Sequence, residues 1–131
     1  MRKEEHILYW RKSSIHDLES AESMFTSGRY DWSLFVGHLA LEKILKAVFV
    51  HKSPDNDMPP KTHNLARLSK LSDIKLDEDQ MFFLDKINDF NIQARYPDYK
   101  LQFYKRCTTD FTRKHLDKIK EFHKCFDALL K

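Results

Sequence analysis

The sequence predicts an all-α protein, an up-and-down four-helix bundle with one additional short helix. Apolar residues recur at helical spacing over four long stretches of the chain. Only two glycines and four prolines occur among 131 residues, which argues against a sheet of many strands joined by tight turns. Ten phenylalanines, five tyrosines and two tryptophans supply a core of ordinary size, so we expect one domain spanning residues 1–131.

The most apolar stretch, residues 29–50, predicts the helix around which the others pack. When its residues are placed at about 100° per position, the apolar side chains fall on two arcs. The broad arc contains Leu34, Gly37, Ala40, Leu41, Ile44, Leu45, Ala47 and Val48, and the second contains Trp32, Val36, Leu39 and Val50. A helix that is apolar on two sides must be covered on two sides.

The first two helices should form a hairpin. Residues 3–26 predict a helix that ends at Ser27-Gly28, because glycine suits a left-handed C-terminal cap. The link to the central helix is so short that the two must lie antiparallel. The central helix should end near His51, before a proline-rich loop over residues 53–60.

Three further helices are expected after this loop. Thr62 is a candidate N-cap for a short helix that carries three leucines. His63, in its first turn, either pins the loop or contributes to a ligand site. Apolar spacing predicts a helix over residues 77–94, which Pro97 should stop, and a last helix over residues 109–130.

A narrow polar stripe runs along the central helix. His38, Glu42 and Lys46 follow one another at four-residue spacing, which places an acid between two cations on one face. Two interpretations stay open: a semi-buried pairing that satisfies Glu42 and fixes the helix register, or a polar cleft beside the core. The first is favoured, because ion pairs at this spacing are common.

The next long helix carries a second polar stripe. Asn88, Asn91 and Arg95 are three and four residues apart, so two amides and one guanidinium can line one groove. Arginine binds phosphate through its planar fork of donors. Alternatively, Arg95 forms a structural salt bridge with Glu42 or Asp98.

Charge and cysteine content bound the environment of the protein. The formal net charge of +3 is too small to identify a nucleic-acid binder, although the basic last helix could face phosphate, an acidic partner or water. Cys107 and Cys125 lack metal or redox spacing and predict free thiols. The sequence shows neither a signal-peptide core nor an apolar run of membrane-spanning length, so we expect a cytoplasmic protein.

Several enzyme classes have no counterpart in this sequence. Gly28 and Gly37 alone cannot build a phosphate-binding glycine loop, and neither GxSxG nor HExxH occurs. His38 and Glu42 are conceivable metal ligands, but spacing identifies no third ligand. We therefore expect no metal and no cofactor.

Three separated motifs extend over nearly the whole chain. They are Gly28-Arg29-Tyr30-Asp31 leading into Phe35-x-x-His38-x-x-Leu41-Glu42-Lys43-x-Leu45-Lys46-Ala47, then Lys61-Thr62-His63-Asn64-Leu65, and then Ala94-Arg95-Tyr96-Pro97-Asp98. In this order they resemble a HEPN domain. The resemblance implies a helical bundle that forms a homodimer, is often encoded beside a minimal nucleotidyltransferase (MNT), and in many relatives is an RNA endonuclease or toxin.

The sequence departs from the ribonuclease members of that family. Those proteins carry an Arg and a His separated by four to six intervening residues, late in the bundle, whereas the first histidine after Arg95 is His115. Only Arg11 and His16 have suitable spacing, and we attribute that pair on the first helix to coincidence. The general acid–base is therefore missing from its expected place, and we predict no catalytic residue. The Arg-Tyr-Pro-Asp motif resembles the branch regarded as a nucleotide- or substrate-binding subunit.

The favoured hypothesis is a non-catalytic binding subunit, a homodimer that acts with an MNT-type nucleotidyltransferase in a toxin–antitoxin-type pair and binds nucleotide, RNA or another polar substrate. The alternative is a metal-independent endoribonuclease toxin neutralised by the same partner. A third hypothesis is a dimeric adaptor without a ligand. The polar stripes and the resemblance together nominate as ligand-binding residues His38, Glu42, Lys46, Asn88, Asn91, Arg95, Tyr96 and Asp98.

Overall fold

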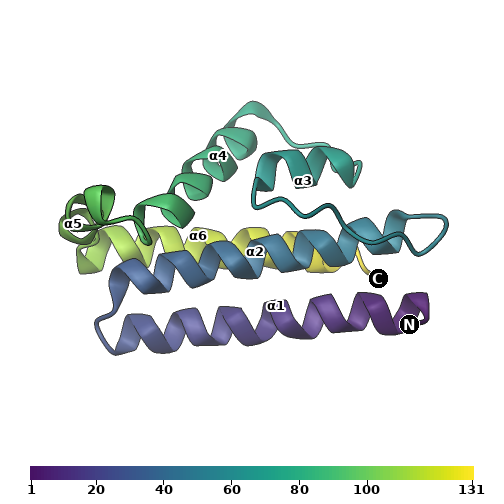
Figure 1. Ribbon diagram of the computed structural model, residues 1–131, viewed down its shortest axis with the longest axis horizontal. Helices are drawn as coiled ribbons and strands as arrows, with labels where there is room; N and C mark the ends of the chain where they lie inside the picture. The colour runs from purple at the N-terminus through teal and green to yellow at the C-terminus, as the bar shows by residue number, and fades with distance from the viewer.

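The computed structural model describes the backbone of residues 1–131 and the side chains of residues 1–96 and 101–131. The described backbone forms six helices and no strand, which confirms the predicted all-α class. The helices are α1 (Lys3–Thr26), α2 (Tyr30–Lys52), α3 (Leu65–Leu71), α4 (Glu78–Gln93), α5 (Pro97–Arg106) and α6 (Thr109–Ala128). Successive long helices α1, α2, α4 and α6 run in alternating directions, and α5 lies at the end of the bundle where α6 begins (Figure 1).

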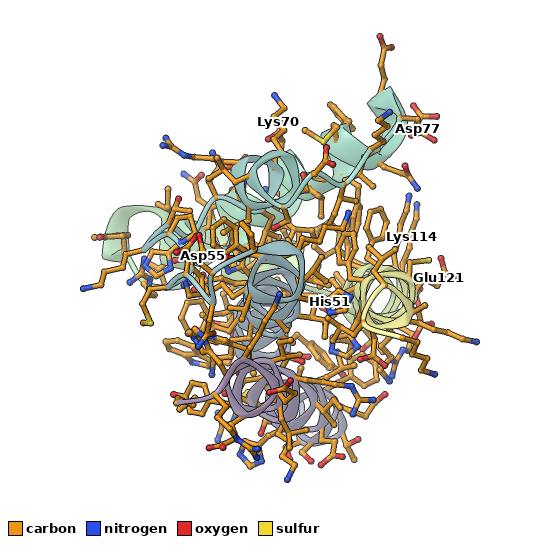
Figure 2. The ribbon with its side chains drawn as sticks, turned by 90° about the vertical axis from the view of Figure 1, so that its right-hand side faces the viewer. His51, Asp55, Lys70, Asp77, Lys114 and Glu121 are labelled. Atoms are coloured by element: carbon orange, nitrogen blue, oxygen red, sulfur yellow. The ribbon has the colours of Figure 1, made fainter. Side chains whose placement is uncertain are left out.

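Helix α2 is the centre of the bundle, as its composition predicted. It contacts α1, α3, α4, α5 and α6, and in the end view it lies between α1 below, α6 to one side, and α3 and α4 above (Figure 2). The broad apolar arc, including Leu34, Leu41 and Ile44, is fully buried. The second arc is covered less completely, because Trp32 is exposed and Leu39 is half-buried.

The predicted hairpin between α1 and α2 is confirmed. Gly28 has a φ of +79°, in the left-handed region that residues with a Cβ rarely adopt. The amide of Arg29 donates to the carbonyl of Met24 at 2.8 Å, and the amide of Gly28 donates to the carbonyl of Phe25 at 3.0 Å. These bonds satisfy carbonyls that the end of α1 leaves open, and they turn the chain directly into α2.

The predicted cap of the short helix is wrong by two residues. Asn64, and not Thr62, is the N-cap of α3, since its Oδ1 accepts from the amide of Arg67 at 3.1 Å. The hydroxyl of Thr62 instead accepts from the amide of Asn64 at 3.2 Å. The chain is still extended at Asn64, with ψ of 107°, so the helix begins only after it.

Helix α5 was not predicted, because Pro97 was interpreted only as a stop signal. A proline also fits the first turn of a helix, where its missing N–H would have no partner within the helix. Here Pro97 is the first residue of α5, which follows α4 after a short link over residues 94–96. Phe103 anchors the new helix in the core, with its ring 5.1 Å from the ring of Phe90.

The two cysteines are free thiols, as predicted, with Cys107 buried and Cys125 exposed. Within the described part of the chain, no helix has both the length and the apolar character that a membrane span requires.

Candidate functional site

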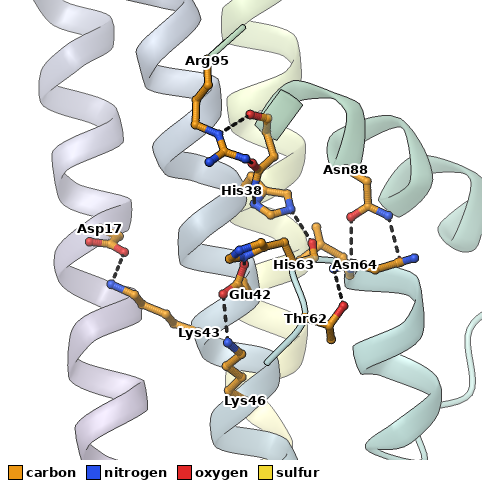
Figure 3. A network of polar contacts seen from close by, with 12 residues as sticks. Asp17, His38, Glu42, Lys43, Lys46, Thr62, His63, Asn64, Asn88 and Arg95 are labelled. Atoms are coloured by element: carbon orange, nitrogen blue, oxygen red, sulfur yellow. Dashed lines mark hydrogen bonds and ion pairs between the residues drawn. The ribbon is translucent and has the colours of Figure 1, made fainter. Parts of the chain in front are cut away.

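The polar stripe of α2 is closed off by the loop that precedes α3. Glu42 is 5% exposed; its Oε2 lies 3.0 Å from Nζ of Lys46, and its Oε1 lies 2.8 Å from Nδ1 of His63 (Figure 3). Lys46 is also buried, with Nζ 5.3 Å from the ring centroid of Trp10. The semi-buried pairing of Glu42 with Lys46 is thus confirmed, but the second basic partner is His63, whereas His38 was expected.

His38 is completely buried and turns toward α4 instead. Its Nε2–H donates to the backbone carbonyl of His63 at 2.9 Å, and its Nδ1 accepts from Nδ2 of Asn91 at 3.2 Å. Because a carbonyl only accepts and an amide nitrogen only donates, the ring is neutral and carries its proton on Nε2. Burial lowers the pKa of His38 to about 4, so this form persists at neutral pH.

Asn91 links His38 to Arg95. The amide oxygen of Asn91 accepts from Nη2 of Arg95 at 2.5 Å, and its backbone carbonyl accepts from Nε at 2.9 Å. The guanidinium is further stacked against the rings of Phe35 and Tyr96, at 5.7 Å and 5.6 Å from their centroids. These contacts hold an exposed cation in one orientation at the end of α4.

Asn88 joins α4 to the start of α3. Its Oδ1 accepts from the amide of Leu65 at 2.8 Å, and its Nδ2 donates to Oδ1 of Asn64 at 3.0 Å. Asn88 therefore satisfies backbone and side-chain groups that the α3 N-terminus would otherwise leave open. It fixes the loop against α4 (Figure 3).

An open pocket of about 270 Å³ lies where α4 meets this loop. It is lined by His63, Asn64, Asn88, Asn91, Ile92 and Arg95. The side chain of His63 is 66% exposed and Arg95 is exposed, so two basic groups from separate elements face one space. The volume is at the small end of ligand pockets and suits a phosphate group with part of the molecule that carries it.

The pairing of His63 with Glu42 also gives the imidazole a defined chemistry. A carboxylate only accepts hydrogen bonds, so Nδ1 of His63 carries a proton, and in the neutral ring the lone pair is on Nε2. This is the arrangement of a general base oriented by an acid. The carboxylate of Glu42 is held in turn by Lys46.

The structure separates the eight nominated residues into groups. Asn88, Asn91 and Arg95 line the pocket, and Tyr96 stacks against Arg95. His38, Glu42 and Lys46 are buried and do not line the pocket. The side chain of Asp98 lies outside the described residues.

His63 and Asn64 are pocket residues that the nominated set lacked. Their signal was the Lys-Thr-His-Asn-Leu motif, which indicated a resemblance but not a place in the fold. Among the described side chains, no group of three or more His, Cys, Asp or Glu residues is placed to hold a metal ion.

Fold and pocket together define a small helical bundle with an open pocket between α4 and the loop before α3. The family model of the HEPN domain matches residues 7–129, nearly the whole chain, and the protein belongs to this family. No curated protein and no solved structure matches the chain.

Proposed function

We propose that this HEPN protein is a binding subunit that holds the phosphate of a nucleotide in the pocket beside Arg95. The observation that carries the proposal is the guanidinium of Arg95, fixed by two hydrogen bonds to Asn91 at the edge of the pocket. An arginine that is already oriented loses little conformational freedom when it binds an anion. His63 lines the same pocket from the loop before α3, and its imidazolium form offers a second donor there.

We further propose that the protein works as a cytoplasmic homodimer with an MNT-type nucleotidyltransferase, in a toxin–antitoxin-type pair. Support for an interface comes from exposed apolar side chains on α4, on α5 and directly before α5: Ile92 on α4, Tyr96 at the N-cap of α5, and Leu101 and Tyr104 on α5. A single exposed apolar side chain is common on protein surfaces, but four of them within residues 92–104 make this stretch the candidate contact surface. Burial of α2 is largely completed within the chain and no longer argues for a dimer.

Light scattering at micromolar concentration tests whether the protein is a homodimer. A molecular mass equal to that of one chain would contradict this part of the proposal. Affinity purification with the product of the adjacent reading frame tests the partner. Co-elution of a small nucleotidyltransferase would support the pairing. If the product of the adjacent reading frame does not bind this protein, the proposed pairing is wrong.

Titration with ATP, ADP, AMP and pyrophosphate tests the binding function. Replacing Arg95 by Lys keeps the charge but removes the planar fork, so we expect about tenfold weaker binding. Arg106→Lys is the matched control, because Arg106 is an exposed arginine on α5 that bonds Gln93 outside the pocket. The proposal fails if wild type binds none of these compounds while Arg95→Lys lowers the melting temperature strongly.

A second function, metal-independent RNA cleavage, is favoured by the His63–Glu42 pair beside Arg95. His63 would take the proton of a ribose 2′-hydroxyl that attacks the neighbouring phosphorus, and Arg95 would stabilise the charge on the phosphate. The bond from phosphorus to the 5′-oxygen would break, water would protonate that oxygen, and a 2′,3′-cyclic phosphate would remain. His115 cannot take this role, because it is buried and its Nδ1 lies 2.7 Å from the carbonyl of Phe111. Cleavage of RNA in EDTA that is lost in His63→Gln would establish this activity. Cleavage by the variant, or none by wild type, would exclude it.

A further inference from the structure

We infer that His38, which is sealed from solvent, positions the two exposed side chains of the pocket, Arg95 on α4 and His63 on the loop. The inference rests on the proposed binding function, because a positioned pair matters only if the pocket holds a ligand. The hydrogen bonds of His38 go to the Asn91 amide and to the backbone of His63, and not to the guanidinium of Arg95 or the imidazole of His63. It acts through the amide of Asn91 on one side and through the backbone of His63 on the other.

The first half of the argument concerns the amide of Asn91. An amide has two orientations related by a half-turn, and they exchange a donor for an acceptor. Only one orientation lets Nδ2 donate to Nδ1 of His38 while Oδ1 accepts from Nη2 of Arg95. In the other orientation, donor would face donor at Arg95 and oxygen would face the lone pair of His38. The lone pair on Nδ1 therefore selects the orientation that binds the guanidinium.

The second half concerns the loop. The Nε2–H of His38 donates to the backbone carbonyl of His63 at 2.9 Å, which fixes the main chain from which that imidazole projects. Glu42 then fixes the imidazole itself through Nδ1. Two bonds from α2, one to the backbone and one to the side chain, thus set the position of His63 relative to Arg95.

A neutral imidazole meets this double requirement. It offers one donor and one acceptor on opposite sides of a rigid ring, so it can serve a carbonyl and an amide nitrogen together. The titratable groups that act on it are Glu42 and His63, with Lys46 beyond Glu42 and Arg95 beyond Asn91; Glu42 is already paired with Lys46 and His63. Protonation of His38 would replace the acceptor by a donor and favour the wrong orientation of Asn91.

The protonation state of His38 can be observed directly. Histidine ring ¹⁵N shifts in the full-length protein should show the proton on Nε2 and a bare Nδ1 from about pH 8 to about pH 5. A ring protonated on Nδ1 in this range would overturn the inference. This measurement needs no ligand.

The effect on Arg95 can be measured in the same way. In His38→Phe, which fills the space without either polar atom, hydrogen exchange at Nη2 of Arg95, the nitrogen that bonds the Asn91 amide, should become at least about tenfold faster, and pyrophosphate binding about tenfold weaker. His123→Phe is the matched control. His123 is also buried, but its Nε2 lies 3.0 Å from the hydroxyl of Ser14, away from the pocket. Unchanged exchange in His38→Phe, or equal acceleration in both variants, would refute the positioning role.

A second variant covers the case in which His38→Phe does not fold. Asn91→Asp presents a carboxylate oxygen where the amide donated, so Nδ1 of His38 should become protonated at pH 7. If Nδ1 stays bare in that variant, Asn91 and His38 are not coupled and the inference fails. If the wild-type protein does not bind pyrophosphate, the proposed binding function is wrong. The ¹⁵N shifts of His38 and the hydrogen exchange of Arg95 still test whether His38 positions the pocket side chains.

Discussion

The imidazole of His63 and the carboxylate of Glu42 meet 2.8 Å apart at the boundary between solvent and core. The side chain of His63 is 66% exposed, whereas the side chain of Glu42 is only 7% exposed. A carboxylate this buried requires positive or donating partners. One partner, Lys46, comes from its own helix and the other from a loop 21 residues further along. Glu42 therefore stabilises the fold and holds the pocket in place at once.

Glu42→Gln should be strongly destabilising. The substitution leaves the buried ammonium of Lys46 without its counter-charge, and breaking a buried pair from one side costs about 3–5 kcal/mol. Urea unfolding of the variant measures this loss. Glu121→Gln is the control, because Glu121 is exposed on α6 and its replacement should change stability by no more than about 0.5 kcal/mol. Similar losses in both variants would mean that Glu42 is not buried with Lys46.

Truncation of the central helix should also be costly. Leu41 is fully buried on α2, so Leu41→Ala should lower the free energy of unfolding by about 2–5 kcal/mol. Lys124→Ala, at an exposed position on α6, should stay within about 0.5 kcal/mol. Equal effects of the two substitutions would contradict the orientation of α2.

Periodicity was sufficient to predict the long helices, because each buries one face against a neighbour and the apolar spacing records that face. It also placed Asn91 and Arg95 together, since residues four apart on a helix are neighbours in any fold. Pro97 was ambiguous for a physical reason. A proline cannot continue a helix, but it suits the first turn of a new one, and local sequence does not distinguish these two cases.

The composition of the pocket could not be predicted in the same way. The spacing of His38 and Glu42 suggested that they pair, but the loop brings the imidazole of His63 to Glu42 and leaves His38 to bond α4. Such a contact depends on how residues 53–64 close over α2. Spacing along one helix contains no information about a loop that folds back on it.

Helices α2 and α6 approach closely at Gly37, and this contact should show coupling to Ile119. A Cβ at Gly37 would lie 3.0 Å from Cδ1 of Ile119. Alanine gains about 1 kcal/mol of helix propensity over glycine, but the crowding opposes it, so Gly37→Ala should be neutral to destabilising in the wild-type background. Ile119→Val removes Cδ1 and should make the same alanine stabilising.

A double-mutant cycle of Gly37→Ala and Ile119→Val measures this coupling by urea unfolding. We expect a favourable interaction energy of about 1 kcal/mol. Additive effects would show that the side chain of Ile119 moves away at no cost, and the close contact would then have no energetic consequence.

Acidification should destabilise the protein in two separate ranges of pH. The pKa of His38 is lowered by burial from 6.5 to about 4, so the unfolded chain binds a proton at this residue before the folded chain does. Stability is therefore highest above pH 6.5 and is lost as the pH falls toward about 4, with a loss on the order of 3 kcal/mol from His38. Burial also lowers the pKa of His115 and His123, which adds to the loss in the same direction.

The second range belongs to Glu22. Hydrogen bonds from Arg113 and then from Lys120 lower its pKa from 4.5 to about 2, so its stabilising effect is present above pH 4.5 and disappears as the pH falls toward 2. Because Glu22 is more than a third exposed, solvent screening keeps this effect under about 1 kcal/mol. A substitution at His38 or at Glu22 should therefore change the pH dependence of stability in one range and leave the other range unchanged.

Replacing His38 by glutamine should flatten the first range and leave the second unchanged. Glutamine does not titrate, so the variant is less stable at pH 7 but loses less stability than wild type between about pH 6.5 and pH 4. Urea unfolding at half-unit intervals of pH compares the two slopes. Glu22→Gln should give the converse result, with the slope preserved above pH 4.5 and reduced below it. Were the slope between pH 6.5 and 4 the same in wild type and His38→Gln, His38 would have to titrate alike in the folded and unfolded chains, and the neutral buried ring that links Asn91 to His63 would be excluded.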